Sequence, residues 1–288
     1  TGEVTNVSSN LWAGNHNVIV TDANGCSVNN SIDITNIYSS FNIDLDTIQQ
    51  VQCYGECNGQ VVLNVNSGGV APYTFNWSTG QNYIGPSTDT LFGLCQGGYQ
   101  VLINDAYGCD TVVSFIISEP SQLYAISSAI QPVQCFGFDD GMANVVGTGG
   151  TGTGSISDYT YSWGFIDDYD TPLADTIISA ITNNTHINLV PGVHVASVTD
   201  TNGCIATDTV LITEPTQLYV DIPDSSAIYS YCLNTNTGTL VARAYGGTPS
   251  YSYSWDNTVQ LSDSVYNLHA GIYTVTVFDD RACTASAS

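Results

Sequence analysis

Apolar and polar residues alternate in short runs along the whole chain. Runs rich in Val, Tyr and Thr are broken by Gly, Pro or Asn-Gly at intervals of about 8–12 residues, which predicts short antiparallel strands. Residues 18–28, VIVTDANGCSV, predict one hairpin, because an Asx-Gly turn lies between two β-forming runs. No apolar run reaches the roughly 18 residues that a membrane-spanning helix needs. The pattern predicts an all-β protein and no membrane insertion of this segment.

Two phrases recur at fixed spacing, so the chain is built from repeats. The first phrase runs from Leu to Cys at residues 11–26, 94–109, 189–204 and 268–283. The second begins with Cys at residues 53–65, 135–146 and 232–244, and leads through a Gly-Gly pair to a Trp. A unit with about seven short strands predicts tandem immunoglobulin-like β-sandwiches, arranged as an elongated rod. The predicted divisions are 1–37, the C-terminal part of a truncated repeat, then repeats at 38–121, 122–217 and 218–288, the last with its final strand cut short.

Aromatic residues recur at two positions of each unit. The tryptophans that follow the Gly-Gly stretch are expected in the core, as on the third strand of an immunoglobulin-like sandwich, and they are Trp77, Trp163 and Trp255. Tyr99 and Tyr273 stand where such a sandwich has its tyrosine corner. The other two copies carry His16 and His194 there, which we interpret as structural substitutes.

Three motifs together resemble the SprB repeat. They are a Gly-Gly stretch ending in Tyr-Ser-Trp (YGGTPSYSYSW, 245–255), the Leu-to-Cys phrase, and the Ile-Ser/Thr-Glu-Pro motif at 117–120 and 212–215. This repeat occurs in very large gliding-motility adhesins on the cell surface of Bacteroidetes. The resemblance implies export by the type IX secretion system, outer-membrane anchoring through parts outside this segment, and attachment to extracellular polysaccharide or a solid surface.

Nine cysteines without Cys-x-x-Cys pairs favour disulfides and an oxidising compartment over zinc. Correspondence between the units favours pairs within a unit, namely Cys53–Cys109, Cys135–Cys204 and Cys232–Cys283. Cys57 and Cys95 occur together in one unit only, which predicts a bond between them. Cys26 is then left unpaired.

A second pairing scheme remains open, because the turn before Cys109 belongs at the opposite end of the sandwich from Cys53. It links each turn cysteine to the first cysteine of the next unit, as in Cys26–Cys53, Cys109–Cys135 and Cys204–Cys232. In an extended rod these pairs are expected to lie too far apart, since a disulfide needs Cα atoms within about 7 Å. We therefore predict pairs within units.

The charge excludes several kinds of partner. Arg243 and Arg281 are the only basic residues against 26 acidic ones, and the formal net charge is −24. Nucleic acids and anionic membrane surfaces both require cationic patches, so neither is expected as a partner. A chain of this charge is self-repelling and attracts cations.

Candidate chemistry is sparse, and we predict that the chain is not an enzyme and requires no cofactor. No histidine or cysteine lies in a pattern typical of nucleophilic catalysis.

Calcium prefers several oxygen ligands from flexible loops, so we hypothesise a calcium site at Asp167, Asp168 and Asp170. Six Asp-Thr/Ser-aliphatic triplets resemble the O-glycosylation signal of exported Bacteroidetes proteins, with acceptors Thr47, Thr90, Thr111, Thr176, Thr209 and Ser264.

The joints between units suggest a mechanical role. SEPSQLY (118–124) and TEPTQLY (213–219) leave almost no free linker, and a proline at each joint stiffens the chain. Neighbouring repeats of the same chain are therefore expected partners, and the chain is predicted to be the stalk or adhesive segment of a surface fibre. Two alternatives are an array of carbohydrate-binding modules, with Tyr83 or Tyr169 stacking on sugars, and the accessory repeats of a secreted enzyme.

Overall fold

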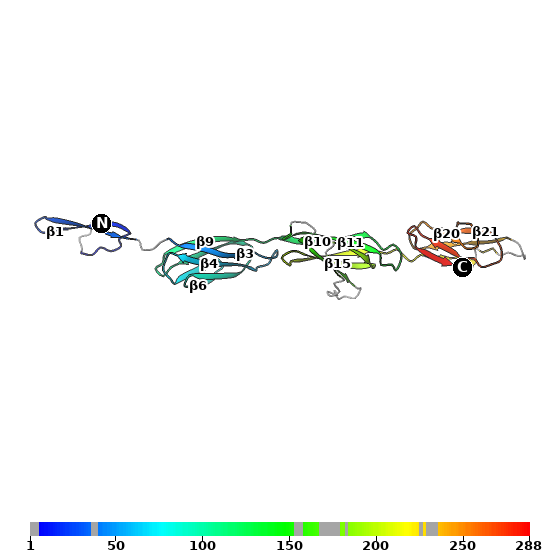
Figure 1. The fold of residues 1–288 in the computed structure, drawn as a ribbon, viewed down its shortest axis with the longest axis horizontal. Coiled ribbons are helices and arrows are strands. Elements are labelled where there is room, and N and C mark those ends of the chain that lie inside the picture. The colour runs from blue at the N-terminus through cyan, green and yellow to red at the C-terminus, as the bar shows by residue number, and fades with distance from the viewer. Residues whose placement is uncertain are drawn as a thin grey trace. The chain divides into compact units, whose positions relative to one another are not determined.

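The computed structural model describes residues 6–35, 40–152, 158–166, 179–181, 184–224, 227–228 and 236–288. The chain divides into two compact units, residues 1–119 and 120–288, whose strands are drawn in Figure 1. All regular structure in the described part is β-strand, because the alternating pattern of β-branched and aromatic residues suits a pleated, half-buried surface. That part holds no helix with the length and apolarity needed to span a membrane.

The first unit begins with a hairpin of β1 (Gly14–Thr21) and β2 (Ser27–Ile34), paired from Gly14 with Ile34 to Thr21 with Ser27. It continues with sandwich 1. One sheet of sandwich 1 has the order β3 (Asn42–Gln49), β4 (Gly59–Ser67), β7 (Thr88–Leu94). The other has the order β6 (Asn82–Gly85), β5 (Tyr73–Trp77), β8 (Gly97–Asn104), β9 (Asp110–Ile117).

The core of sandwich 1 follows directly from strand alternation. Along β4 the side chains of Val61, Leu63 and Val65 are buried while those between them are not. They meet Phe75 and Trp77 of the facing sheet in one continuous apolar cluster. Burial between two antiparallel sheets therefore holds this sandwich together.

The second unit contains sandwich 2. One sheet has the order β10 (Ser121–Gln131), β11 (Gly141–Gly150), β14 (Thr185–Leu189). The other has the order β13 (Ser179–Ile181), β12 (Thr160–Ile166), β15 (Gly192–Thr199), β16 (Ile205–Ile212). Both orders repeat those of sandwich 1.

Sandwich 3 completes the second unit with shorter strands. Two of its sheets are pairs, β17 (Tyr219–Asp221) with β19 (Arg243–Tyr245) and β18 (Gly238–Val241) with β21 (Ser264–Leu268). The third has the order β20 (Ser252–Trp255), β22 (Val275–Phe278), β23 (Thr284–Ala287).

The chain is all-β and consists of tandem immunoglobulin-like sandwiches, as predicted. Their arrangement as an elongated rod stays a prediction. The tryptophans expected in the core, Trp77, Trp163 and Trp255, are each at most 4% exposed. The indole N–H of Trp77 donates to Oδ2 of Asp89 (2.6 Å), and that of Trp255 donates to the carbonyl of Ser262 (3.0 Å). The repeat boundaries proposed from the sequence stay a prediction.

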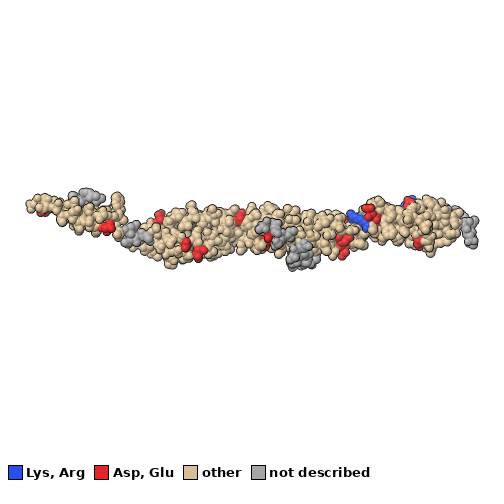
Figure 2. Space-filling view, turned by 45° about the horizontal axis from the view of Figure 1, so that its top comes forward, with Lys and Arg blue, Asp and Glu red and all other residues tan. Residues whose placement is uncertain are grey.

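Acidic side chains are scattered over the visible face and do not gather into one patch (Figure 2). With a formal net charge of −24, the surface repels polyanions.

Candidate functional site: the cysteine-bearing turns and loops

One turn recurs four times, between the last two strands of each repeat. An aspartate opens every copy and a cysteine closes it, at residues 22–26, 105–109, 200–204 and 279–283. In the second copy, Oδ1 of Asp105 accepts hydrogen bonds from the backbone N–H groups of Tyr107 (2.9 Å) and Cys109 (2.8 Å). Asp279 does the same for Arg281 and Cys283, both at 2.9 Å. The carboxylate thereby fixes the backbone that carries the cysteine.

The other carboxylate oxygen ties this turn to the Gly-Gly stretch. Oδ2 of Asp105 accepts a hydrogen bond from the N–H of Val70 (3.0 Å), and Oδ2 of Asp279 accepts one from the N–H of Thr248 (2.8 Å). A Cβ at Gly247 would lie 2.6 Å from Oδ2 of Asp279, so a larger residue would displace the carboxylate. The Gly-Gly pair is therefore required for close backbone approach.

Hydrogen bonding decides the protonation state of two of the turn aspartates, Asp105 and Asp200. Burial alone would raise the pKa of Asp105, but the N–H groups of Cys109, Tyr107 and Val70 stabilise the carboxylate and bring its pKa below the usual value. The pKa of Asp200 is also lowered, since its hydrogen bonds outweigh the effect of burial. Both turns are built around an ionised carboxylate.

The fourth turn departs from the others at one residue. Gly25, Gly108 and Gly203 precede the cysteine with φ between 85° and 88°, whereas the fourth copy has Ala282 at φ 63°. The turn keeps its form there, because the hydrogen bonds of Asp279 hold an L-residue in the left-handed region.

A second conformation recurs in the loop that carries the first cysteine of a repeat. In the β10–β11 loop, the N–H of Phe138 donates to the carbonyl of Cys135 (3.1 Å), and the N–H of Gly137 donates to Oε2 of Glu214 (2.9 Å). In the β3–β4 loop, the N–H of Gly55 donates to Oε2 of Glu119 (2.8 Å). The glutamate of each Glu-Pro motif thus holds the loop at the end of the sandwich where the last strand ends.

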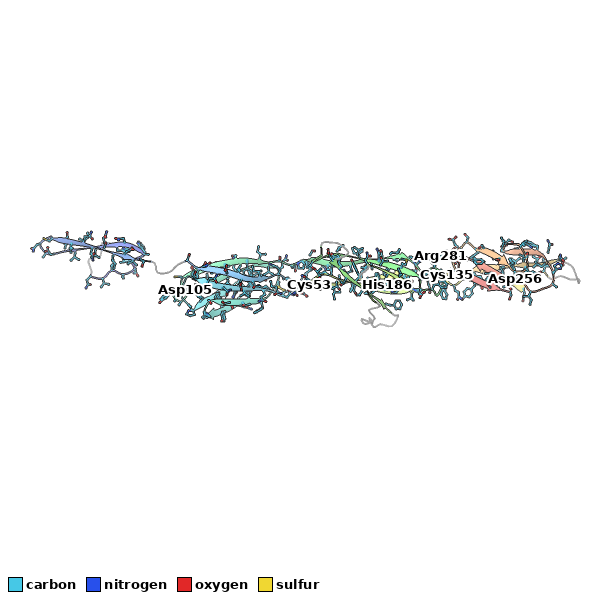
Figure 3. All side chains as sticks on the ribbon, in the orientation of Figure 1. Cys53, Asp105, Cys135, His186, Asp256 and Arg281 are labelled. Carbon is cyan, nitrogen blue, oxygen red and sulfur yellow. A yellow bond between two sulfur atoms is a disulfide. The ribbon has the colours of Figure 1, made fainter. Side chains whose placement is uncertain are left out.

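A disulfide joins sandwich 2 to sandwich 3. Cys135 of the β10–β11 loop bonds Cys283 of the fourth turn, with the Cα atoms 5.7 Å apart and a sequence separation of 148. Arg281 lies beside Cys135 (Figure 3), and its Nη1 donates to the carbonyl of Val133 at 3.0 Å. The joint between these two repeats is therefore covalent, and one of the two basic residues of the chain adds a hydrogen bond to it.

This bond corrects two predictions. Cys135–Cys204 and Cys232–Cys283 are both wrong, because Cys135 and Cys283 bond each other. The reason is the length of β16: Cys204 precedes this eight-residue strand, and Glu214, which holds the Cys135 loop, follows it. Such a strand spans about 26 Å, far beyond the reach of a disulfide. Cys232 itself lies outside the described residues.

The prediction of Cys53–Cys109 is wrong for the same reason. Cys109 is a free, exposed thiol at the start of β9, while Glu119, beyond the end of β9, holds the Cys53 loop. The alternative pairs Cys26–Cys53 and Cys109–Cys135 are wrong as well, since Cys26 and Cys109 are free. Cys53 and Cys204, the counterparts of Cys135 and Cys283, are both disulfide-bonded.

Sandwich 1 contains the predicted Cys57–Cys95 disulfide. It links the β3–β4 loop to the turn between β7 and β8, over 38 residues. This bond stays within one sandwich, unlike the bond at the joint.

The tyrosine-corner position makes one contact in all four copies, to the carbonyl four residues earlier. The hydroxyl groups of Tyr99 and Tyr273 donate to the carbonyls of Cys95 (3.0 Å) and His269 (3.3 Å). Nε2 of His16 lies 2.7 Å from the carbonyl oxygen of Trp12, and Nε2 of His194 lies 2.9 Å from that of Val190. The two histidines therefore occupy a structural role.

The hypothesised metal ligands Asp167, Asp168 and Asp170 lie outside the described residues, as does Tyr169. Within the described ranges, no three His, Cys, Asp or Glu side chains converge as metal ligands would. The calcium site stays a hypothesis.

The proposed glycosylation triplets include aspartates with structural contacts. Oδ1 of Asp89 accepts the N–H of Thr90 (2.8 Å), and Oδ2 of Asp208 accepts both the N–H and the hydroxyl of Ser127 (2.7 Å each). Thr47 and Thr209 are exposed, Thr90, Thr111 and Ser264 are half-buried, and Thr176 lies outside the described residues. Modification of these residues stays a prediction.

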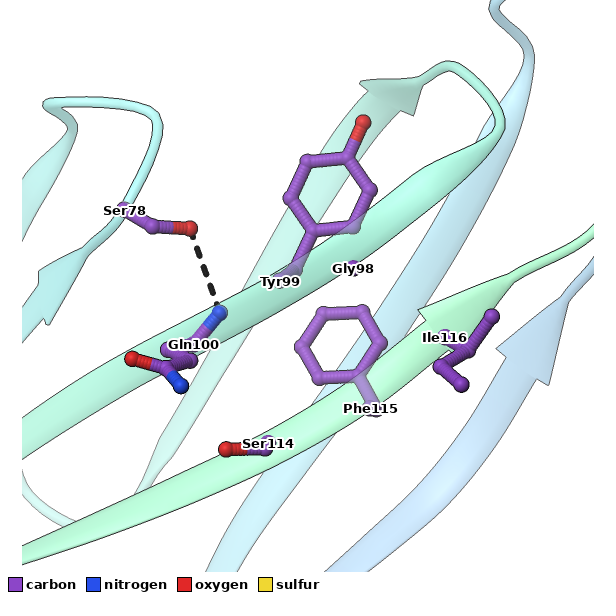
Figure 4. Close-up of a pocket in the computed structure, with 7 residues that line it drawn as sticks. All are labelled: Ser78, Gly98, Tyr99, Gln100, Ser114, Phe115 and Ile116. Carbon is purple, nitrogen blue, oxygen red and sulfur yellow. Dashed lines mark hydrogen bonds between the residues drawn. The ribbon is translucent and has the colours of Figure 1, made fainter.

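Sandwich 1 has an open depression of about 510 Å³ on β8 and β9 (Figure 4). Its lining residues are Ser78, Gly98, Tyr99, Gln100, Ser114, Phe115 and Ile116. The rings of Tyr99 and Phe115 stack on each other with centroids 5.7 Å apart, and Phe115 is buried. Tyr83, elsewhere on the sandwich, stacks on Phe75 at 6.2 Å. These aromatic rings already pack against protein.

Two regions of the chain match a known family. The sequence model of the SprB repeat matches residues 45–82 and 230–260. Both of these regions are SprB-repeat sequence. The first match covers β4 and β5 of sandwich 1, and the second covers β18, β19 and β20 of sandwich 3. SprB repeats together with disulfides are typical of extracellular or surface proteins.

Other comparisons give weaker likenesses. No curated protein sequence matches the chain. Among solved structures, the three N-terminal domains of the Hoc capsid protein of bacteriophage RB49 are 12% identical, with 86% of this chain and 97% of that one covered and a TM-score of 0.37. A C-terminal fragment of intimin, solved with the intimin-binding domain of its receptor, is 14% identical over 65% and 67% of the two chains, with a TM-score of 0.34. The fold assignment rests on the strand pairing described above.

Proposed function

We propose that this chain is a non-catalytic segment of a cell-surface adhesin fibre, acting as stalk or adhesive segment in surface attachment or gliding motility. The covalent joint between sandwiches 2 and 3, formed by Cys135 and Cys283, carries the proposal. A bond that ties one SprB-type sandwich to the next serves continuity along a fibre, and it has no evident use in a catalytic centre.

The buried polar groups support a structural role. The buried polar or charged residues of the described part are Asp105, His194, Asp200 and Asp279, and each contacts the backbone of its own sandwich. A catalytic acid or base needs a position from which it can reach a substrate. These groups are engaged in shaping turns.

Charge and joint sequence agree with a fibre. Glu-Pro motifs at 119–120 and 214–215 limit flexibility between repeats, and we propose that the repeats stack end to end as a rod. The net charge of −24 keeps neighbouring fibres apart. The proposed partner is extracellular polysaccharide or a solid surface.

Deletion of residues 1–288 from the native protein tests this proposal. We expect intact parent cells to be labelled by antibodies against the chain, and the deletion strain to attach more weakly to glass and to polysaccharide-coated surfaces. Attachment and movement equal to those of the parent, or labelling only after cells are permeabilised, would overturn it. Selective binding of one glycan by a single sandwich would support the carbohydrate-binding alternative, and loss of a secreted enzymatic activity would support the accessory one.

A further inference from the structure

We propose that the Cys135–Cys283 disulfide is a tension bypass: it carries pulling force past sandwiches 2 and 3, so that neither has to unfold under load. This goes beyond the proposed function, because it concerns how force travels through the chain whatever surface the chain meets.

The bypass follows from where the two cysteines lie along the chain. A force that enters at the start of β10, near Ser121, reaches Cys135 in the loop directly after that strand. It crosses the disulfide to Cys283 and leaves along β23, the last strand of sandwich 3. Residues 136–282, which include most of both sandwiches, are connected in parallel with the bond and bear none of that force.

Both ends of the bond are anchored in ordered structure. On the side of sandwich 2, Glu214 and Thr213 hold the loop through the N–H groups of Gly137 (2.9 Å) and Val133 (2.9 Å). On the side of sandwich 3, the carboxylate of Asp279 holds the N–H groups of Arg281 and Cys283. The hydrogen bond from Arg281 to the carbonyl of Val133 spans the joint beside the disulfide. The two sulfur atoms are thus kept together by contacts that do not depend on the bond itself.

Without the bond, the same force would pass through the hydrogen-bonded strands. A backbone hydrogen bond is far weaker than a covalent bond, so paired strands separate long before a disulfide breaks. Most of residues 136–282 would then be free to extend, apart from the part that the disulfide of Cys204 still holds.

Single-molecule stretching of the full chain tests the bypass. One handle is attached at position 121, through a side chain that couples without a thiol, and the other at the C-terminus. In the oxidised chain only residues 121–135 and 283–288 can straighten, which limits the distance between the handles to roughly 70 Å at about 3.6 Å per residue. Cys135→Ser is expected to extend further by hundreds of ångströms, up to roughly 530 Å, because residues 136–282 are released. The disulfide of Cys204 stays in place in this variant and keeps the gain below that upper bound.

Controls separate this result from misfolding. The double variant Cys57→Ser/Cys95→Ser removes a disulfide outside the handles and should leave the extension unchanged. If Cys135→Ser fails to fold, the wild-type chain with and without a thiol reductant gives the same comparison. Steps of hundreds of ångströms in the oxidised chain, or peptide mapping that finds Cys135 unbonded to Cys283, would overturn the bypass. Neither readout involves attachment, so failure here is distinct from failure of the proposed function.

Discussion

One disulfide of the chain lies within a single sandwich, and another joins two sandwiches. Cys57–Cys95 closes a loop of 38 residues inside sandwich 1, whereas Cys135–Cys283 spans 148 residues and joins two sandwiches. Both begin in the same kind of loop, between the first and second strands of a sandwich. In sandwich 1 that loop carries both Cys53 and Cys57, four residues apart. Cys57 bonds within its own sandwich, whereas Cys135, which corresponds to Cys53, bonds at a joint.

Removal of the disulfide at the joint by Cys135→Ser should have the largest effect on stability. In the chain-entropy account, a disulfide that closes 148 residues stabilises by up to about 5 kcal/mol, and one that closes 38 residues by about 4 kcal/mol. We expect Cys135→Ser to separate the unfolding of sandwiches 2 and 3 into two transitions in calorimetry, because their covalent coupling is lost. The matched control, Cys57→Ser/Cys95→Ser, should lower only the transition of sandwich 1. A single unchanged transition for sandwiches 2 and 3 in Cys135→Ser would contradict the coupling.

Ala282→Gly, in the turn that carries Cys283, should have a smaller effect and should raise the stability of sandwich 3. Ala282 holds φ 63°, which costs an L-residue about 1–2 kcal/mol, while glycine adds some entropy to the unfolded chain. The net gain in stability of sandwich 3 is expected to be about 1 kcal/mol, measured by denaturant unfolding. Gly108→Ala in the free-cysteine turn is the mirror control and should destabilise sandwich 1. Loss of stability in Ala282→Gly would show that the left-handed turn is not strained.

The smallest expected effect is a loss of stability of the turns at low pH. The pKa of Asp105 and that of Asp200 are lowered in the folded chain, whereas an unfolded Asp titrates near 3.9. Their contribution to stability is thus complete above about pH 4 and is lost as the pH falls through the lower folded pKa. The amide resonances of Cys109 and Cys204 should report this in an NMR titration. Asp105→Asn should abolish the titration at Cys109 and leave that at Cys204; equal loss at both would contradict the assignment.

Much of the fold was predictable from the sequence, because repetition and strand alternation act locally. The alternating run at residues 59–65 became β4, and Trp77, Trp163 and Trp255 are buried. The Cys57–Cys95 bond was predictable too, since the two cysteines occur together in one repeat. Pairing of the remaining cysteines was not, because a repeated sequence gives two cysteines the same position in every unit and does not say whether their partners lie in the same unit or another.

Two roles in the joint were missed, although the sequence carries a signal for each. The aspartate four residues before each turn cysteine is present in all four copies, and it proves to hold the turn. Glu119 and Glu214 stand in both Glu-Pro motifs, whose effect was attributed to the proline alone. The fixed spacing shows that these residues recur in the repeats. Only the structure shows which backbone N–H donates a hydrogen bond to each carboxylate.

The joint disulfide also imposes an order of events on biosynthesis. Cys135 is synthesised 148 residues ahead of Cys283, so its thiol must wait, unoxidised, until the following repeat has folded. Cys204 is synthesised earlier than Cys283, but once sandwich 2 has folded, β16 separates it from the waiting thiol. Folding of sandwich 2 thus prevents the wrong disulfide from forming. The correct disulfide can form only after the next repeat has been synthesised and has folded.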